Sequence, residues 1–371
     1  MSPDLISIVT SASMALITFL SGCLIAATPW LTRGREAFAV SVPETAQADP
    51  RIRSMRRAYL ACILIISAAS ALVTLAFSST HPLAMAAVVC APVAAGFLLM
   101  LAFRARVRAI KRSEGWGGAH SARLSAVAGA AEANAPRPLP LAWNLLYLPV
   151  ILATLALSLA LYPAMPDPVP VHFNAAGAVD DYMAKGWQVI AMPIAVQAFM
   201  ALCLTASHWQ ILRSRRPSSP EHPVASAIAY GMFARAQSAT LLVTGIVITV
   251  SIAIMPLAFA GVVTSDQSFV ALIAIIVAAI LPNLAVSLVY GQAGSRLLRR
   301  MTASSELGFD DDESWHLGLF YINREDPSVV VPRRFGIGWT MNWGNPKSWG
   351  LAALLVAAIV VFVVLIEVLF R

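Results

Sequence analysis

The chain has 371 residues, of which 58% are hydrophobic and only 12% charged, and its formal net charge is +7. Soluble globular proteins average about 45 to 50% apolar and about 25% charged residues. The composition therefore excludes an ordinary soluble enzyme and indicates a membrane protein. Because the basic residues lie between apolar stretches, the positive charge favours attraction to anionic lipid headgroups, and we expect no nucleic-acid partner.

Eight apolar stretches are long enough to cross a bilayer, whose core of about 30 Å needs about 20 apolar residues per helix. The predicted spans are 5–29, 59–78, 83–103, 141–162, 187–207, 238–260, 268–291 and 350–370. The first begins without a positive charge and is followed by Arg33 and Arg35, which is unlike a secretory signal. We expect it to be retained, with its N-terminus outside.

The basic residues alternate between the loops. Residues 30–58, 104–140, 208–237 and 292–349 carry six, seven, four and seven, which is 24 of the 26 lysines and arginines. Short basic loops face the cytoplasm. The sequence therefore predicts a multi-pass protein of the bacterial plasma (inner) membrane with both termini outside. Five tryptophans lie at predicted span ends, where an indole is favoured, and so support the predicted spans: Trp30, Trp143, Trp187, Trp209 and Trp349.

The predicted architecture is an all-α transmembrane bundle with a small cytoplasmic β-hairpin module before the last span. Four regions follow: 1–140, three spans and a small-residue-rich linker; 141–300, a four-span core; 301–349, the module; and 350–371, the last helix. All four cysteines lie inside predicted spans, where they serve most simply as small apolar residues.

Polar residues inside the spans are few, and ionisable residues there usually mark transport pathways. The only acid is Glu367, four residues before Arg371 near the outer interface. Asn144, Gln197 and Asn283 are neutral; they either line a cavity or form hydrogen bonds between helices. This pattern disfavours an ion-coupled pump.

The loop from Pro163 to Gly186 is expected to be the one sizeable outer loop. Its four closely spaced prolines forbid a helix, and Gly177 permits a turn. Three interpretations stay open: a structural cap in which Asp180 or Asp181 bonds His172, a ligand contact, and an acid–base or metal site. Because no zinc or nucleophile motif accompanies His172, we expect no metal, no cofactor and no catalytic residue. The candidate residues are Asp167, His172, Phe173, Asn174, Gly177, Asp180 and Asp181.

The segment before the last span has a strand pattern. Leu317–Ile322 is predicted to be a strand, Asn323–Pro327 a turn, and Val329–Trp343 one longer strand or two. Aromatic and apolar residues recur with period two from Phe335 to Trp343, which predicts an apolar face against the bundle or the headgroups. The acidic run Asp310–Glu313 is predicted to be a solvated linker.

The candidate residues of this module are Tyr321, Asn323, Arg333, Arg334, Trp339 and Trp343. Arg333 and Arg334 are expected to contact lipid phosphate or an acidic partner.

The string PDPVPVHFNAAGAVDDY resembles the Pro-Asp-x-x-Pro-x-His-Phe-Asn-x-x-Gly signature of a bacterial family of multi-span membrane proteins of unknown biochemical function. That family is related to the Sdp toxin immunity protein, which protects against a secreted peptide toxin and holds a transcriptional repressor at the membrane. The segment from Trp315 to Gly350 resembles a short domain appended to some members. This chain is longer than the Sdp relative, with extra N-terminal spans and a different C-terminal half.

The resemblance implies a non-enzymatic, receptor-like, immunity or signalling protein for an extracytoplasmic peptide or envelope stress, with a cytoplasmic regulator as a second partner. Two alternatives stay open. One is a transporter or channel for a neutral solute or lipid, and the other is a membrane-embedded enzyme that uses His172 and the nearby carboxylates.

Overall fold

The computed structural model describes residues 3–33, 35–77, 82–116, 135–173, 179–216, 219, 222–302, 311–336 and 338–370. Eight candidate spans in this part of the chain are helical, long and apolar enough to cross a membrane. This confirms the predicted all-helical bundle of about eight spans. The helices that form them are α1 (Pro3–Leu31), α2 (Pro50–Phe77), α3 (Pro82–Ser113), α5 (Tyr147–Leu161), α6 (Trp187–Arg213), α7 (Pro223–Ile252) with α8 (Ile254–Phe259), α9 (Ser265–Tyr290) and α11 (Pro346–Phe370).

Several helices run further than the predicted spans. α2 begins at Pro50 rather than near 59, α3 continues to Ser113 rather than 103, and α7 begins at Pro223 rather than 238. Hydropathy locates the part of a helix that lies in hydrocarbon, whereas backbone hydrogen bonds continue wherever the residues are good helix formers. The basic loop predicted at 208–237 is therefore largely helix.

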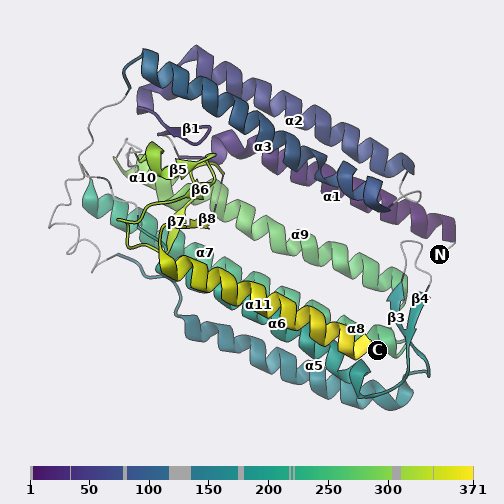
Figure 1. Cartoon of the computed structure of the whole chain (residues 1–371). Coiled ribbons are helices and arrows are strands. Elements are labelled where there is room, and N and C mark those ends of the chain that lie inside the picture. Colours follow the sequence, from purple (N-terminus) through teal and green to yellow (C-terminus); the bar gives the residue numbers. More distant parts are fainter. Residues whose placement is uncertain are drawn as a thin grey trace.

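The helices form two groups (Figure 1). α1, α2 and α3 pack along one another as a three-helix unit, and α7 packs against α6 and α9 in the core. α11 lies against α6, where the rings of Phe199 and Phe362 stack with their centroids 4.1 Å apart. A short helix, α10 (Ser295–Thr302), follows α9 after a bend in which Gly291 and Gly294 have positive φ.

Small antiparallel hairpins close the two ends of the bundle. β3 (Val169–Phe173) and β4 (Val179–Met183) lie at one end, here termed the hairpin end. The opposite end, termed the module end, holds β5 (Trp315–His316) paired with β6 (Phe320–Tyr321) and β7 (Val330–Pro332) paired with β8 (Trp339–Met341). α1 starts and α11 finishes at the hairpin end.

The strand predicted at Leu317–Ile322 is shorter than expected. Leu317 and Gly318, with φ of 51° and 72°, make the turn between β5 and β6, so only Phe320 and Tyr321 form the second strand. The predicted turn at Asn323–Pro327 contains no strand, and Val329–Trp343 folds as two strands. The β-hairpin module before the last span is thus present.

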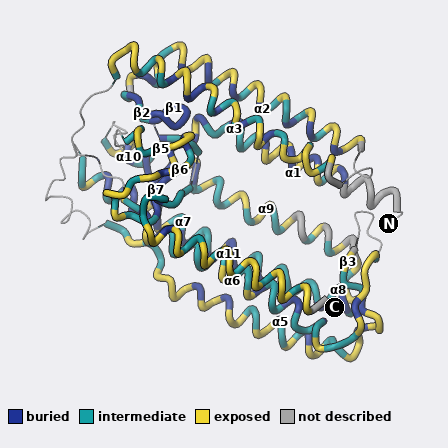
Figure 2. Tube along the Cα trace, viewed as in Figure 1, coloured by how far each residue is buried: buried dark blue, intermediate teal, exposed yellow. Residues whose placement is uncertain are grey.

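Burial is concentrated at the module end, while the helix faces elsewhere expose many apolar residues (Figure 2). A tight hairpin of β1 (Glu36–Ala37) and β2 (Val40–Ser41) inserts Phe38 between α2 and α3, where its ring contacts Tyr59 and Phe103 at centroid distances of 5.8 and 5.1 Å. In contrast, none of the most apolar stretch of α11 is buried in the protein, as expected for a helix that faces lipid.

Candidate functional sites at the two ends of the bundle

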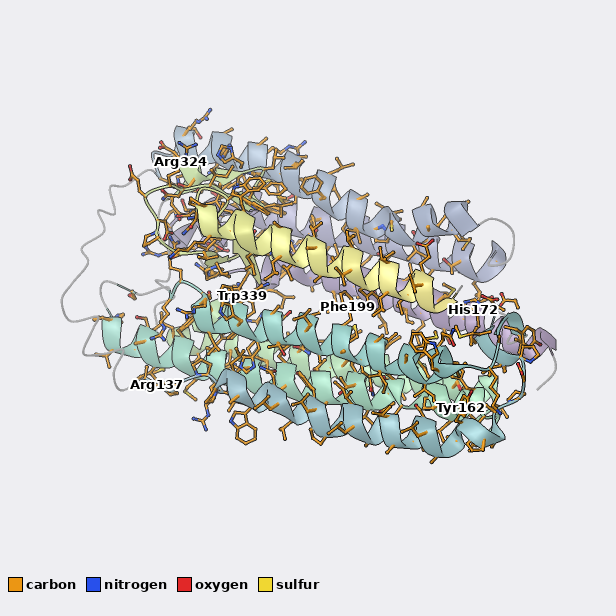
Figure 3. The ribbon with its side chains drawn as sticks, turned by 60° about the horizontal axis from the view of Figure 1, so that its bottom comes forward. Arg137, Tyr162, His172, Phe199, Arg324 and Trp339 are labelled. Atoms are coloured by element: carbon orange, nitrogen blue, oxygen red, sulfur yellow. The ribbon has the colours of Figure 1, made fainter. Side chains whose placement is uncertain are left out.

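The tip of the β3–β4 hairpin presents an exposed histidine–carboxylate pair. His172 Nδ1 lies 2.6 Å from Asp180 Oδ1, and the two side chains are 65% and 42% exposed. Asp181, paired with His172 in the strand register, uses its carboxylate to accept the backbone N–H of Tyr182 at 2.9 Å. Phe173 ends β3, while Asn174 and Gly177 lie outside the described residues. Figure 3 shows His172 at the opposite end of the molecule from Trp339 and Arg324.

The base of the same hairpin is held rigidly. Val169 is fully buried and Met183 nearly so, in an apolar cluster with residues of α6 and α8. Lys185 donates its Nζ to the carbonyls of Met165 and Pro163 at 2.7 and 3.3 Å, and its backbone N–H to Asp167 at 3.1 Å. Asp167 therefore positions the hairpin, whereas His172 and Asp180 remain accessible at its tip.

The described residues contain no group of three or more His, Cys, Asp or Glu side chains that could hold a metal ion. The exposed pair can donate and accept hydrogen bonds, and the two acids favour a basic ligand.

The three amides predicted inside the bundle lie in separate polar clusters. Gln197 donates to Thr154 Oγ1 and to the carbonyl of Thr249, at 2.8 and 2.7 Å, and so joins α5, α6 and α7. Asn283 donates to Thr244 Oγ1 at 3.1 Å and joins α9 to α7. Such bonds hold helices together in lipid. Asn283 also lines a cavity of about 420 Å³ between α1 and α9, but the other two amides do not.

Asn144 bonds a histidine that the sequence did not single out. Its Nδ2 donates to Nδ1 of the buried His208 at 2.9 Å, and His208 Nε2 lies 3.0 Å from the carbonyl of Leu139. These partners require the neutral tautomer with a proton on Nε2. His208 therefore acts as a polar clamp between α6 and the segment before α5.

The module is organised around the fully buried Asn342. Its Nδ2 lies 2.8, 3.0 and 3.1 Å from the carbonyls of Asn323, Asp326 and Ser328, and its Oδ1 accepts the backbone N–H groups of Asn323 and Gly344 at 3.0 and 3.1 Å. The Asn342 side chain thus supplies the turn after β6 with hydrogen bonds that a neighbouring strand would otherwise make. The sequence pattern gave no signal for Asn342, because its role depends on a loop that folds back on it.

The module residues predicted from the sequence differ in burial and in the elements that they contact. The fully buried Tyr321 donates its hydroxyl to Asp326 at 3.0 Å, and Arg333 donates to the carbonyl of Trp339 at 3.0 Å while remaining exposed. Trp339 packs on Phe233 of α7 with ring centroids 5.9 Å apart, and Trp343 packs on Trp349 at 5.0 Å. The ring of Phe335 lies 5.9 Å from those of Phe38 and Tyr59, so the module contacts both helix groups.

Arg334 is buried, which corrects the expectation that it contacts lipid phosphate. The side chain is 3% exposed and donates to both Asp311 and Asp312. Asp312 also bonds Lys111 Nζ at 2.8 Å and the backbone N–H of Ser41 at 3.0 Å. Burial by itself raises the pKa of Asp312, but Arg334 and Lys111 outweigh it and hold the pKa at about 2.

The acidic run is therefore not a solvated linker over Asp311 and Asp312. Asp311 also pairs with Arg215 at 3.3 Å, and Arg215 bonds Asp326 at 2.7 Å. This charge cluster joins the module to α3, to the β1–β2 hairpin and to the segment after α6.

The fold defines a multi-pass helical membrane protein with a hairpin at one end and a small β module at the other. Residues 150–196 match the family model of a domain of unknown function, DUF1648, and residues 324–349 match that of a family of unknown function, DUF5808. The first match covers most of α5, the β3–β4 hairpin and the start of α6. The second covers β7, β8 and the start of α11. No curated protein and no solved structure matches the chain.

Proposed function

We propose that the protein is a receptor-like, non-enzymatic membrane protein that recognises an extracytoplasmic peptide at the β3–β4 hairpin and reports to the β module. The observation that carries this proposal is the path of α6. This helix begins at Trp187, directly after the hairpin, and ends at Arg213. The next residues are bonded to the module: Ser214 forms a bridge with Val330, and the Arg215 N–H donates to the Val330 carbonyl at 2.9 Å.

A continuous helix with one end fixed to each site is a physical means of coupling them. The clamped base of the hairpin transfers a force at its tip to α6, and Arg215 carries the other end of α6 into the charge cluster of the module. A cytoplasmic regulator that binds the module then senses the position of α6.

The accessible tip supports a peptide as the ligand. Within the described residues β3 pairs only with β4, so their outer edges offer backbone groups to an extended peptide. Asp180 and Asp181 favour a basic one. The resemblance of the loop to a family related to the Sdp toxin immunity protein supports the same class of ligand.

The proposed orientation places the hairpin end outside the plasma membrane of a bacterium and the module end in the cytoplasm, because the basic loops lie at the module end. Cysteines at the exposed positions Tyr182 and Glu325, each in a background without the native cysteines, test it. We expect a membrane-impermeant thiol reagent to label Tyr182→Cys in intact cells and to label Glu325→Cys only after lysis. The reverse pattern contradicts the orientation.

Recognition is tested by photo-crosslinking from Tyr182, which lies on the hairpin and is 56% exposed. With p-benzoylphenylalanine there, we expect a peptide adduct in cells that meet the ligand. His172→Leu should lower the yield about tenfold, since a hydrogen bond to a charged group contributes about 1.5 kcal/mol or more. His172→Asn keeps a hydrogen-bond donor and an acceptor, so it should retain most of the crosslinking yield.

The same crosslinker at Glu325 is the matched control and should capture no extracytoplasmic peptide. If α6 couples the two ends, the peptide adduct at Tyr182 also changes hydrogen exchange of residues 315–345. An adduct that contains only phospholipid, or equal loss in both His172 variants together with bound metal, contradicts the proposed recognition.

A further inference from the structure

An arginine-lined pocket lies at the module end, where α1 ends beside α10. The cavity has a volume of about 350 Å³ and is lined by Arg33, Arg56, Arg296, Arg299 and Arg300, with no acidic residue among its lining side chains. The arginines come from three places in the sequence: the end of α1, the start of α2 and α10. Only the fold brings them together, and the result is a concentrated positive charge.

The positive charge of this pocket is poorly compensated by the protein. The one ion pair of Arg33 among the described residues is with Glu36, at 3.7 Å. Burial raises the pKa of Glu36 to about 7, so this carboxylate is a weak counter-charge near neutral pH. Arg33 Nε and Nη2 and Arg56 Nε are buried without a hydrogen-bond partner in the described part of the chain. Buried donors of this kind usually have a partner, so these two arginines keep unused hydrogen-bonding capacity beside the pocket.

A second, apolar cavity lies along the same helix, α1. The cavity of about 420 Å³ between α1 and α9 is lined by Leu24, Ile25 and Leu31 on one side and by Ala279, Ile280 and Leu284 on the other. Leu24 to Leu31 spans about 10 Å along the helix axis. This cavity, here termed the seam, therefore extends along α1 from Leu31, the neighbour of the pocket residues Trp30 and Thr32, toward the centre of the bundle.

Arg296, which lines the pocket, links the ends of the two helices between which the seam lies. Its guanidinium donates to the carbonyl of Leu288 at 2.7 Å and to that of Trp30 at 3.1 Å, which ties the end of α9 to the end of α1. Trp30 lines the pocket and is 41% exposed. An indole and arginines at the end of a span are typical of the headgroup layer, so the pocket lies at the depth of lipid phosphates.

We propose that the pocket and the seam together bind one anionic phospholipid, with its phosphate among the five arginines and one acyl chain between α1 and α9. Guanidinium groups bind phosphate oxygens through paired hydrogen bonds, and basic pockets between transmembrane helices bind lipid headgroups. A soluble phosphate would fill only the polar half. The bound lipid joins the three-helix unit to the core, because α1 belongs to the first and α9 and α10 to the second.

Native mass spectrometry of the full chain in detergent, titrated with phosphatidylglycerol or phosphatidylcholine, tests the headgroup pocket. Arg299→Gln with Arg300→Gln should weaken phosphatidylglycerol binding by about fivefold for each arginine removed. The matched control is Arg53→Gln with Arg57→Gln, an equal charge change at exposed residues of α2 outside the pocket. Phosphatidylcholine binding should not change in either double variant. If both double variants lose phosphatidylglycerol binding equally, the lipid is attracted by net charge alone and the proposed site is wrong.

The seam is tested separately by filling it. Ala279→Phe should weaken phosphatidylglycerol binding, whereas Ala278→Phe, an exposed neighbour that does not line the seam, should not. Inorganic phosphate at millimolar concentration should displace the lipid only weakly. If it displaces the lipid completely and Ala279→Phe binds like the wild type, the pocket takes free phosphate and the lipid assignment is wrong. Unchanged hydrogen exchange in the helices shows that each variant is folded.

Discussion

Replacing Asn342 with alanine is expected to unfold the β module while the helical bundle stays intact. The substitution removes the side-chain partner of three carbonyls and one N–H group in the turn after β6 and of the Gly344 N–H after β8, in a place where Asn342 itself is fully buried. Each orphaned buried group costs about 1 to 3 kcal/mol. Even with water entering part of the site, the loss should be at least about 3 kcal/mol. Hydrogen exchange of residues 315–345 in lipid nanodiscs measures it.

The matched control is Asn345→Ala, three residues further along the chain. Its side chain donates to the Pro327 carbonyl at 2.9 Å and caps the start of α11 by accepting the Lys347 N–H at 3.0 Å, but it lies at the surface. Loss of such a cap costs about 1 kcal/mol. Asn342→Asp, which keeps Oδ1 and loses the donor, should resemble Asn342→Ala. Similar exchange in Asn342→Ala and Asn345→Ala would show that Asn342 does not organise the module.

Hydropathy and charge predicted the number and position of the spans because lipid imposes a length and a polarity on every helix that crosses it. The prolines before His172 likewise excluded a helix there, and this segment supplies strand β3 of the β3–β4 hairpin. Helix ends such as Pro223 were missed because the hydropathy pattern stops where lipid stops. The β1–β2 hairpin was missed because Phe38 and Ala39 adopt positive φ without a glycine, held there by tertiary contacts with α2 and α3.

The candidate sites were only partly predictable for a related reason. The period-two pattern indicated an apolar face, and Phe335 and Trp339 do lie against the helices. The partners of Asp311 and Asp312 come from α3, from the segment after α6 and from Arg334, so a local acidic run could not reveal them. The arginine pocket could not be predicted from the sequence for the same reason, since its arginines were assigned to two separate cytoplasmic basic loops.

Arg334→Met is expected to separate the module from the three-helix unit and to weaken the acid dependence of their contact. The side chain is 3% exposed, pairs with Asp311 and Asp312, and lies over the Trp315 ring at 5.6 Å. Removing one partner of a buried ion pair costs about 3 to 5 kcal/mol, because the remaining charges stay buried. Exchange of the Ser41 amide, which donates to Asp312, reports the contact directly.

The pH dependence has a definite sign. The pKa of Asp312 is about 2 in the folded protein against an ordinary 3.8, so its stabilisation, about 2 kcal/mol, is fully present above pH 4 and is lost as pH falls through 2. Without Arg334 the folded pKa rises toward 3.8, so the acid-dependent stabilisation from Asp312 shrinks and its loss is complete at a higher pH. Arg333→Met is the matched control, because this neighbouring arginine is exposed and bonds the Trp339 carbonyl. Should both methionine variants release the Ser41 amide at the same pH as the wild type, the buried charge cluster does not hold the two units together.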